Sequence, residues 1–419
     1  GTVRLETASD TAQHIAPMRP PCQDGVIVSN GLLYWGPWMC GCELSLYGHI
    51  CLGPEKNSAA ATQNIPPRRT VYTNQLDAVE SLADHSAAWP AYRGDQHQSS
   101  TTQIPVPKQT HPAWSTQVTK SALLTAPVIA GNMIFLADRS GVIYAYDRQG
   151  KLLWKQYTGG AIFYPPTVSK DRLYAGSADG RVYAFAAKTG QPLWSFRVAP
   201  EQRWIPVYGK LISTWPVAGG VVIQNDTLYA AAGIAHFDGT HLVALDPITG
   251  ELKQENNTSG VLSPTVNSGI SLQGSLFIEE GELRFLAGGV YEIARYDLQT
   301  LKCLNTPRTE VQSQFRTAFY PYYPEYGKYL SIEHTLADRR ELVHDASYEG
   351  SVFTNLTLKE ALPPGAPQEK KEVARWLSMR ARRTGESFKR KNIWEDQQQR
   401  RFTSFIVSPE VLLAAGHPD

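Results

Sequence analysis

The stretches GVIYAYDRQGKLLW (Gly141–Trp154) and GRVYAFAAKTGQPLW (Gly180–Trp194) repeat one pattern. Each holds an alternating apolar strand, a turn with a glycine, and a short run that ends on tryptophan. Trp114 precedes them, so three indoles recur at steps of forty residues. Two further apolar runs separated by turn residues fill the rest of each step, and short strands at this spacing predict a meander of antiparallel sheet.

A third copy, WPVAGGVVIQNDTLYAAAGIAHFDGTHLVALDPITGEL, comes later than the spacing requires because EQRWIPVYGKLIST is inserted before it. More degraded copies occupy residues 29–54, 268–304 and 402–416. Repeats of forty to fifty residues with four strands each are typical of a β-propeller, whose blades are stable only between neighbours. We therefore predict an all-β fold: a seven- or eight-bladed β-propeller of four-stranded antiparallel blades, with one short helical insertion.

The composition excludes several classes of protein. The 419 residues carry 40 Lys and Arg against 39 Asp and Glu, so no overall charge attracts nucleic acid. No apolar run approaches the roughly 18 residues of a transmembrane helix. The chain starts on an apparent strand without a basic and apolar signal segment. We expect an exported protein whose signal has been removed, and a sequence that is a piece of a longer chain.

Four of the five cysteines, Cys22, Cys40, Cys42 and Cys51, fall within thirty residues, whereas Cys303 stands alone. Asn30-Gly31 between apolar runs predicts a hairpin that sets Cys22 almost opposite Cys40. A disulfide among these four cysteines would indicate an oxidising compartment such as the periplasm. Cys40 and Cys42 with His49 are an alternative metal set, but their spacing is not that of a zinc knuckle.

Shifts in composition predict the organisation of the chain. We expect a first blade region with the cysteine cluster at residues 1–55, a linker or long loop at 56–88, the main blades at 89–361, a basic helical insertion at 362–400 and a closing strand at 401–419. Within the insertion, Val373, Trp376, Leu377 and Ala381 share one helix face. The excess of Lys and Arg there could contact an acidic partner or nucleic acid, but a solvated helix packed by its tryptophan is the simpler interpretation.

The turn ALDPITG (Ala244–Gly250) and its relatives resemble the tryptophan-docking motif of the PQQ-binding-like β-propellers, the quinoprotein alcohol dehydrogenases and their non-catalytic relatives. In that family the indole stacks on a neighbouring motif and its N–H meets a backbone carbonyl. The matching positions here are Trp114, Trp154 and Trp194, the acidic Asp147 and Asp246, and the glycines Gly150, Gly190 and Gly250. The match lapses at Ala186, and at Lys253 or Gln254, where tryptophan belongs.

Segments such as WPAYRGDQHQSS (Trp89–Ser100) also resemble large exported members of this family that often sit beside cytochrome modules. The resemblance implies two functions. One is a protein-binding or scaffolding subunit of an envelope complex or of a redox complex that contains a cytochrome. The other is a PQQ-dependent oxidoreductase with Ca²⁺; a carbohydrate-binding propeller is a third alternative. Because folds host unrelated activities, the motif alone does not choose among them.

The chemical signatures of an enzyme are missing from the sequence. The dehydrogenases of this family use an adjacent cysteine pair, which is not found here, and no CxxCH motif for haem is present. HFDGTH (His236–His241) could suggest a metal site, but Asp238-Gly239 is better explained as a tight turn. We therefore expect no catalytic residue, no metal and no cofactor, with PQQ and Ca²⁺ as the alternative.

Two segments offer candidate binding residues. The inserted segment RWIPVYGKLIST is rich in aromatic and basic groups and would emerge on a rim, where functional loops are commonly attached. Its candidates are Arg203, Trp204, Tyr208 and Lys210, and Arg93 is a further one in WPAYRGD. A packed connection that caps the core is the competing explanation. The leading hypothesis is a non-catalytic, periplasmic or otherwise exported scaffold that binds envelope proteins, with no nucleic acid and no transmembrane segment.

Overall fold

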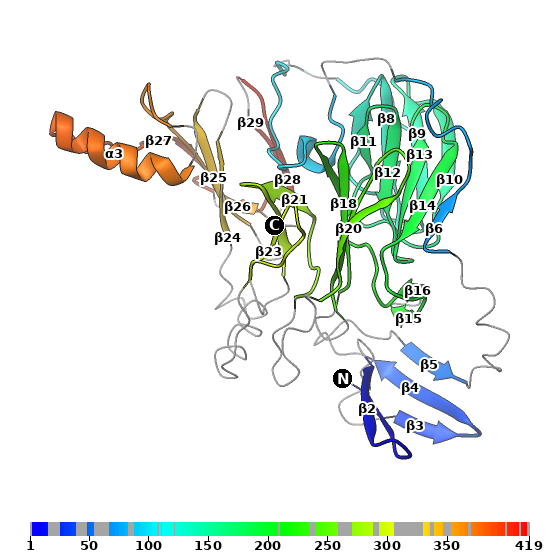
Figure 1. Cartoon of the computed structure of the whole chain (residues 1–419). Helices are drawn as coiled ribbons and strands as arrows, with labels where there is room; N and C mark the ends of the chain where they lie inside the picture. The colour runs from blue at the N-terminus through cyan, green and yellow to red at the C-terminus, as the bar shows by residue number, and fades with distance from the viewer. Residues whose placement is uncertain are drawn as a thin grey trace. The chain divides into compact units, whose positions relative to one another are not determined.

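The computed structural model describes the chain as a series of strands and one long helix (Figure 1). The described residues are 2–15, 26–38, 48–53, 67–82, 88–106, 109, 111–120, 122–207, 210–234, 239–258, 270–287, 293–305, 330–335, 339–346, 353–367, 370–398, 400–409 and 412–416. They fall into two compact units: residues 1–98 with 111–320, and residues 99–110 with 321–419. None of the helices in these stretches has the length and apolar character of a membrane crossing.

The first unit contains consecutive antiparallel meanders, which we call blades 1 to 4. Blade 1 consists of β7 (Val128–Ala130), β8 (Met133–Ala137), β9 (Val142–Asp147) and β10 (Leu152–Tyr157). Blade 2 consists of β11 (Thr167–Ser169), β12 (Arg172–Gly176), β13 (Arg181–Ala186) and β14 (Pro192–Arg197). Blade 3 consists of β17 (Val221–Gln224), β18 (Thr227–Ala232), β19 (His241–Leu245) and β20 (Leu252–Asn256). Blade 4 is described through β21 (Phe277–Glu279), β22 (Glu282–Leu286) and β23 (Ile293–Asp297).

These sheets confirm the all-β propeller prediction, and local chemistry explains their turns. The first two strands of blades 1, 3 and 4 are joined by two-residue turns, Gly131-Asn132, Asn225-Asp226 and Glu280-Gly281. Both residues of each turn have positive φ. This geometry matches the right-handed twist of paired strands and favours Asn, Asp and Gly.

A bulge recurs at one place in blades 1 to 3. The pairing of the third and fourth strands shifts just before Trp154 in blade 1, Trp194 in blade 2 and Gln254 in blade 3. Trp154 pairs with Ala145, Trp194 with Ala184 and Gln254 with Ala244. Of the two residues that the sequence offered for the missing tryptophan, Gln254 therefore holds the equivalent position.

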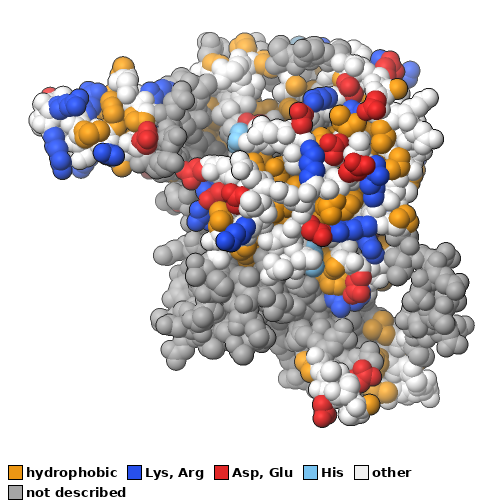
Figure 2. Space-filling view, viewed as in Figure 1, with side chains coloured by type: hydrophobic (Ala, Val, Ile, Leu, Met, Phe, Trp, Pro, Cys, Tyr) orange, Lys and Arg blue, Asp and Glu red, His pale blue; other side chains and the backbone are white. Residues whose placement is uncertain are grey.

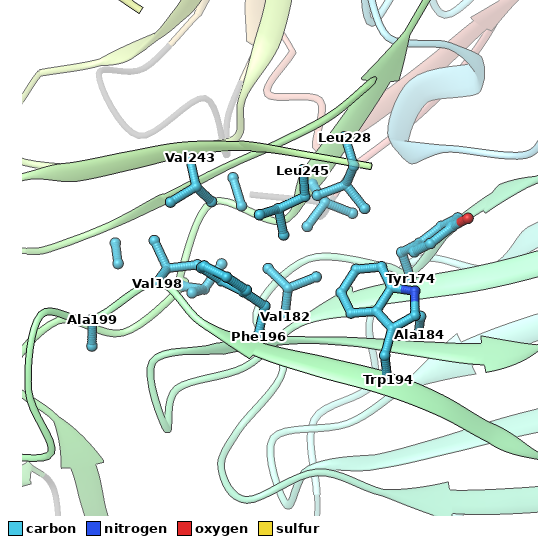
Figure 3. Close-up of a cluster of buried hydrophobic side chains, with 14 of the residues drawn as sticks. Tyr174, Val182, Ala184, Trp194, Phe196, Val198, Ala199, Leu228, Val243 and Leu245 are labelled. Atoms are coloured by element: carbon cyan, nitrogen blue, oxygen red, sulfur yellow. The ribbon is translucent and has the colours of Figure 1, made fainter. Parts of the chain in front are cut away.

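The hydrophobic core lies between blades rather than within them, because each sheet has two apolar faces. Blades 1 and 2 share one cluster of buried side chains, blades 2 and 3 a second, and blades 3 and 4 a third. Figure 3 shows the second cluster, where Trp194 and Phe196 of blade 2 lie beneath Leu228 and Leu245 of blade 3. On the visible surface of the blades, acidic and basic side chains are interspersed (Figure 2).

The segment expected as a linker, residues 56–88, contains a strand. β6 (Arg69–Val71) pairs antiparallel with the outer strand β14 and makes blade 2 five-stranded. Farther along, Leu76 and Val79 pack against the core between blades 2 and 3, and Leu82 packs against the core between blades 1 and 2. The described part of this segment is therefore an ordered strap along blade 2, which the three-residue run Arg-Thr-Val was too short to reveal.

The N-terminal region is also built of strands. β1 (Thr2–Glu6) pairs with β2 (Thr11–Ile15), and β3 (Val26–Ser29), β4 (Leu32–Trp38) and β5 (Gly48–Leu52) form a three-stranded sheet. The predicted Asn30-Gly31 hairpin is confirmed, since Ser29 pairs with Leu32. Cys51 on β5 is an exposed free thiol, and a disulfide among the four N-terminal cysteines stays a prediction. Cys22, Cys40 and Cys42 lie outside the described residues.

The second unit contains a four-stranded sheet of β24 (Leu330–Thr335), β25 (Glu341–Ala346), β26 (Phe353–Lys359) and β27 (Asn392–Glu395). Helix α3 (Lys370–Thr384) is inserted between its last two strands, within the predicted helical insertion. β28 (Ser404–Val407) and β29 (Leu412–Ala415) form a two-stranded hairpin in the segment where the closing strand is predicted. Trp376 is half-buried, and the Arg380 guanidinium lies 5.7 Å from the centre of its ring.

Candidate functional site

The three periodic tryptophans occupy equivalent places. Each donates its indole N–H to a backbone carbonyl in the turn between the third and fourth strands of the next blade along the chain. Trp114 bonds Arg148 O at 2.8 Å, Trp154 bonds Ala187 O at 3.1 Å and Trp194 bonds Pro247 O at 3.3 Å. We call the end of the blades that carries these turns the docking end. Exposure falls from 41% for Trp114 to 0% for Trp194, so the last contact is the most enclosed.

Glycine lies directly under each indole. Gly150, Gly190 and Gly250 have φ between 72° and 81°, in the left-handed region where a side chain is strained. A Cβ at Gly150 would come 2.6 Å from the Trp114 ring, and one at Gly250 would come 2.5 Å from the Trp194 ring. Each glycine is therefore required twice, once by its backbone conformation and once by the ring above it.

Acidic residues close two of the same turns. The Asp147 carboxylate accepts hydrogen bonds from the backbone N–H groups of Gln149 and Lys151. Asp246 accepts them from Ile248 and Thr249, at 2.9 Å each, and from the Thr249 hydroxyl. Partial burial alone would raise the pKa of Asp246, but these donors and Lys253 outweigh it, so the pKa lies below its usual value.

The turn of blade 4 shows what happens where the tryptophan is missing. Leu301 stands at the glycine position, with φ 53°, and its N–H still donates to Asp297 O. Its side chain is fully buried in the core between blades 3 and 4. The Tyr229 hydroxyl donates a hydrogen bond to the carbonyl of Leu298. The Tyr174 hydroxyl donates in the same way to the carbonyl of Pro247 in the preceding pair of blades. With Gln254 in place of an indole, a leucine side chain fills the slot instead.

The opposite end of the blades carries the connections from one blade to the next, and we call it the connection end. The inserted segment forms a hairpin here, β15 (Trp204–Val207) and β16 (Lys210–Ser213). Ile205 and Ile212 are buried against Ala161 and Ala178. One face of the hairpin is therefore packed, as expected for a connection that caps the core.

Some side chains of this hairpin nevertheless face solvent. Trp204 is 40% exposed and Leu211 is 65% exposed. Lys210, also exposed, donates through Nζ to Arg139 O, and the Arg139 N–H bonds Leu123 O. This chain of contacts brings Leu123 and Leu124, which are 74% and 44% exposed, close to the hairpin. We call Leu123, Leu124, Trp204, Lys210 and Leu211 the connection-end patch.

The predicted binding residues are thus only partly brought together. Trp204 and Lys210 belong to the patch. The Arg203 guanidinium instead lies 4.4 Å from the centre of the Trp215 ring, and its Nε donates to the Thr214 hydroxyl. Tyr208 lies outside the described residues. Leu123 and Leu124 were missed because two leucines in a loop carry no periodic signal, although their position beside a turn of blade 1 could have indicated exposure.

Arg93 lies near a small pocket at the start of the first strands of blades 2 to 4. The pocket has about 280 Å³ of empty space, part of it open to solvent, and is lined by Tyr92, Asp95, Gln98, Tyr164, Thr167 and Ser275, among others. The rings of Tyr92 and Tyr164 contact each other edge to face, with their centres 5.2 Å apart. Burial, with Tyr92 beside it, raises the pKa of Tyr164 to about 12 against the opposing effect of Arg93, so its hydroxyl stays protonated at neutral pH.

The described residues contain no group of three His, Cys, Asp or Glu side chains arranged to hold a metal ion. His236, Phe237 and Asp238 of the HFDGTH segment lie outside them. His241 is on β19, with its ring edge-on to Trp215 at 5.9 Å. Its described surroundings are those of a packed aromatic cluster.

Curated relatives match parts of the chain. It is 35% identical to the outer membrane protein assembly factor BamB of Burkholderia pseudomallei over 121 residues. This match covers 29% of this chain and 28% of the relative. The factor of the same name from Moranella endobia is 28% identical over 200 residues, 40% of this chain and 46% of that one. The quinohemoprotein alcohol dehydrogenase ADH-IIG of Pseudomonas putida is 26% identical over a match that covers 33% of this chain and 20% of the relative. The chain spans less than half of each of these relatives.

Among solved structures, BamB from Moraxella catarrhalis aligns over 69% of this chain and 68% of its own, with 16% identity and a TM-score of 0.37. A europium-containing methanol dehydrogenase aligns over 66% of this chain and 58% of its own, with 12% identity and a TM-score of 0.42. A family model described as outer membrane protein assembly factor BamB matches residues 106–322, more than half of the chain. The chain therefore belongs to this family of PQQ-like β-propeller repeats.

Proposed function

We propose that this chain is a non-catalytic scaffold that binds other envelope proteins during the assembly of outer membrane proteins. The connection-end patch carries the proposal. Contiguous exposed apolar side chains are uncommon on soluble proteins and often mark an interaction surface. Here Trp204 and Leu211 lie on the outer face of the hairpin, whose other face is packed through Ile205 and Ile212. Lys210 links this hairpin to the loop that exposes Leu123 and Leu124.

The patch suits a protein partner. Trp204 offers a large, half-exposed ring that can anchor in a pocket, which is the usual role of tryptophan at the centre of an interface. Lys210 adds positive charge at one edge, so the partner surface would be apolar with an acidic margin. The packed face holds the patch in shape before binding, which lowers the entropy lost on association.

The relatives named as outer membrane assembly factors support an exported location and envelope partners. They support these partners better than the cytochrome-bearing redox complex, which remains a weaker alternative. The indole, glycine and aspartate positions of the docking end would then have a structural role: they hold neighbouring blades together, so that the connection end presents a rigid surface.

The test compares two double variants, each of which replaces two exposed apolar side chains by serine. W204S/L211S removes two exposed apolar side chains from the patch, and L152S/L252S removes two of similar exposure from the outer strands of blades 1 and 3. We expect the first variant to weaken binding to purified outer membrane assembly proteins of the source cell by at least about tenfold, since loss of an anchor commonly costs more than 1 kcal/mol. The control pair should bind normally.

Both variants should unfold within a few degrees of the parent protein, because surface substitutions cost little stability. Equal binding by the two variants would show that the patch is not the interface. Absence of any binding by the parent protein, with the fold intact, would contradict the scaffold proposal itself.

The oxidoreductase alternative fits the structure poorly. Of the described residues, those lining the small pocket beside Tyr164 include a single carboxylate, Asp95, and its volume of about 280 Å³ counts space open to solvent. Pockets that enclose a ligand of drug size usually hold about 300–1,000 Å³. The lining of this pocket therefore gives no support to a site for PQQ and Ca²⁺. A quinone absorbance band in protein purified from the source cell would revive that alternative.

A further inference from the structure

Helix α3 has a marked excess of positive charge. Its fifteen residues contain Lys370, Lys371, Arg375, Arg380, Arg382 and Arg383 against a single acid, Glu372. The whole chain, by contrast, is nearly neutral. Within the part of the chain that the structure describes, Arg375, Arg382 and Arg383 are exposed and take part in no ion pair. These charges are therefore not used to stabilise the second unit.

The same helix has an apolar side that the structure covers only in part. Val373, Trp376 and Leu377 are only half-buried, and Met379 is 42% exposed. None of the described side chains of α3 is buried. Figure 2 shows its hydrophobic side chains lying between Lys and Arg side chains on the visible face. A helix whose apolar side is covered only in part gains less from tertiary packing, which normally supplies most helical stability.

The pattern of side chains indicates what could cover this face. A protein groove that holds a helix requires apolar anchors at i, i+3 or i+4, and i+7. Starting from Val373, the third anchor position is Arg380, whose guanidinium lies 5.7 Å from the centre of the Trp376 ring. A cation in the middle of the apolar stripe would be buried without a partner in such a groove. At a lipid surface, however, a long basic side chain can reach the phosphates while its stem and the indole remain among the acyl chains.

We propose that α3 binds the surface of a membrane rich in anionic lipid. The helix would lie in the plane of the headgroups, with Val373, Trp376 and Leu377 toward the acyl chains and Arg375 and Arg382 on the opposite side. Arg380 and Arg383, which follow the apolar side chains on their own side of the helix, would extend to the lipid phosphates. Low overall hydrophobicity, a cationic polar face and a tryptophan on the other face are the features of interfacial helices. This contact is independent of the connection-end patch, and it adds a second attachment to the proposed scaffold.

The experiment uses the full chain and two kinds of vesicle, one of phosphatidylcholine alone and one with roughly a third phosphatidylglycerol, a content that gives a strongly negative surface. We expect the protein to sediment with the anionic vesicles at low salt, and to be released at about 0.5 M salt because surface charges are then screened. R375Q/R382Q/R383Q should lower the partition coefficient by about 100-fold, since each surface cation contributes about a fivefold factor.

The matched control, K151Q/K155Q/K302Q, removes the same charge from exposed lysines of the blades and should bind like the parent protein. W376S should also weaken binding, which a purely electrostatic attraction would not show. Equal loss in the two charge variants, or no sedimentation of the parent protein with anionic vesicles, would overturn the proposal. So would tighter binding to an acidic peptide or an oligonucleotide than to the vesicles. The R375Q/R382Q/R383Q variant should still bind protein partners through the patch.

Discussion

The two ends of the blades follow different rules. At the docking end, Trp114, Trp154 and Trp194 make one contact three times, each with a glycine beneath the ring. At the connection end, the inserted hairpin β15–β16 lies between blades 2 and 3 and exposes Trp204 and Leu211. The comparison teaches that repetition marks what the blades need in order to pack, whereas the part that occurs once is free to serve a function.

The largest expected effect concerns the most enclosed indole. W194A should destabilise the protein by about 3–5 kcal/mol, because it removes a fully buried aromatic side chain between blades 2 and 3. W114A should cost clearly less, since 41% of that side chain is already in solvent. Chemical denaturation of the two variants checks this order, and equal losses would mean that burial does not set the strength of the contact.

A smaller effect is expected from the glycine under the same ring. G250A forces a Cβ to 2.5 Å from the indole at φ 72°, so we expect a loss of about 2–4 kcal/mol. Gly281 is the matched control, with φ 77° and no atom within 4 Å of its added Cβ. G281A should show only the backbone strain, about 1–2 kcal/mol. Thermal unfolding of the pair separates the contact from the strain.

The smallest effects concern pH, and they should have opposite signs at the two ends. The lowered pKa of Asp246 at the docking end means that its carboxylate stabilises the fold above the usual aspartate pKa, and that this stability is lost as pH falls through the folded value. We expect D246N to cost about 1 kcal/mol at neutral pH and progressively less in acid.

At the connection end, burial raises the pKa of Asp179, although hydrogen bonds from Tyr183 and Arg181 oppose the shift. The folded state therefore favours the protonated acid, and the carboxylate weakens the fold as pH rises above the usual value. D179N should gain stability relative to the parent protein between acid and neutral pH. Unfolding midpoints across this range test both residues, and parallel curves for the two variants would contradict the distinction.

The sequence predicted the repeated end far better than the unique one. The forty-residue step of tryptophan and the turn glycines indicated the blades and the position of each contact, because packing between identical blades leaves a periodic trace. Strand β6 and the exposed Leu123 and Leu124 left none, since their positions depend on tertiary contacts of a single segment. Leu301 was likewise missed, because propensity alone does not favour a leucine with positive φ.

The blade 4 turn provides the most direct test of the account that an indole and a glycine form one unit. Q254W alone should destabilise the protein because Leu301 fills the slot, and L301G alone should destabilise it by opening a cavity. Combined, the two changes recreate the arrangement of the other turns. A double-mutant cycle should therefore give a favourable coupling of about 1–3 kcal/mol. Losses that simply add would contradict the central claim that the indole and the glycine tie neighbouring blades together.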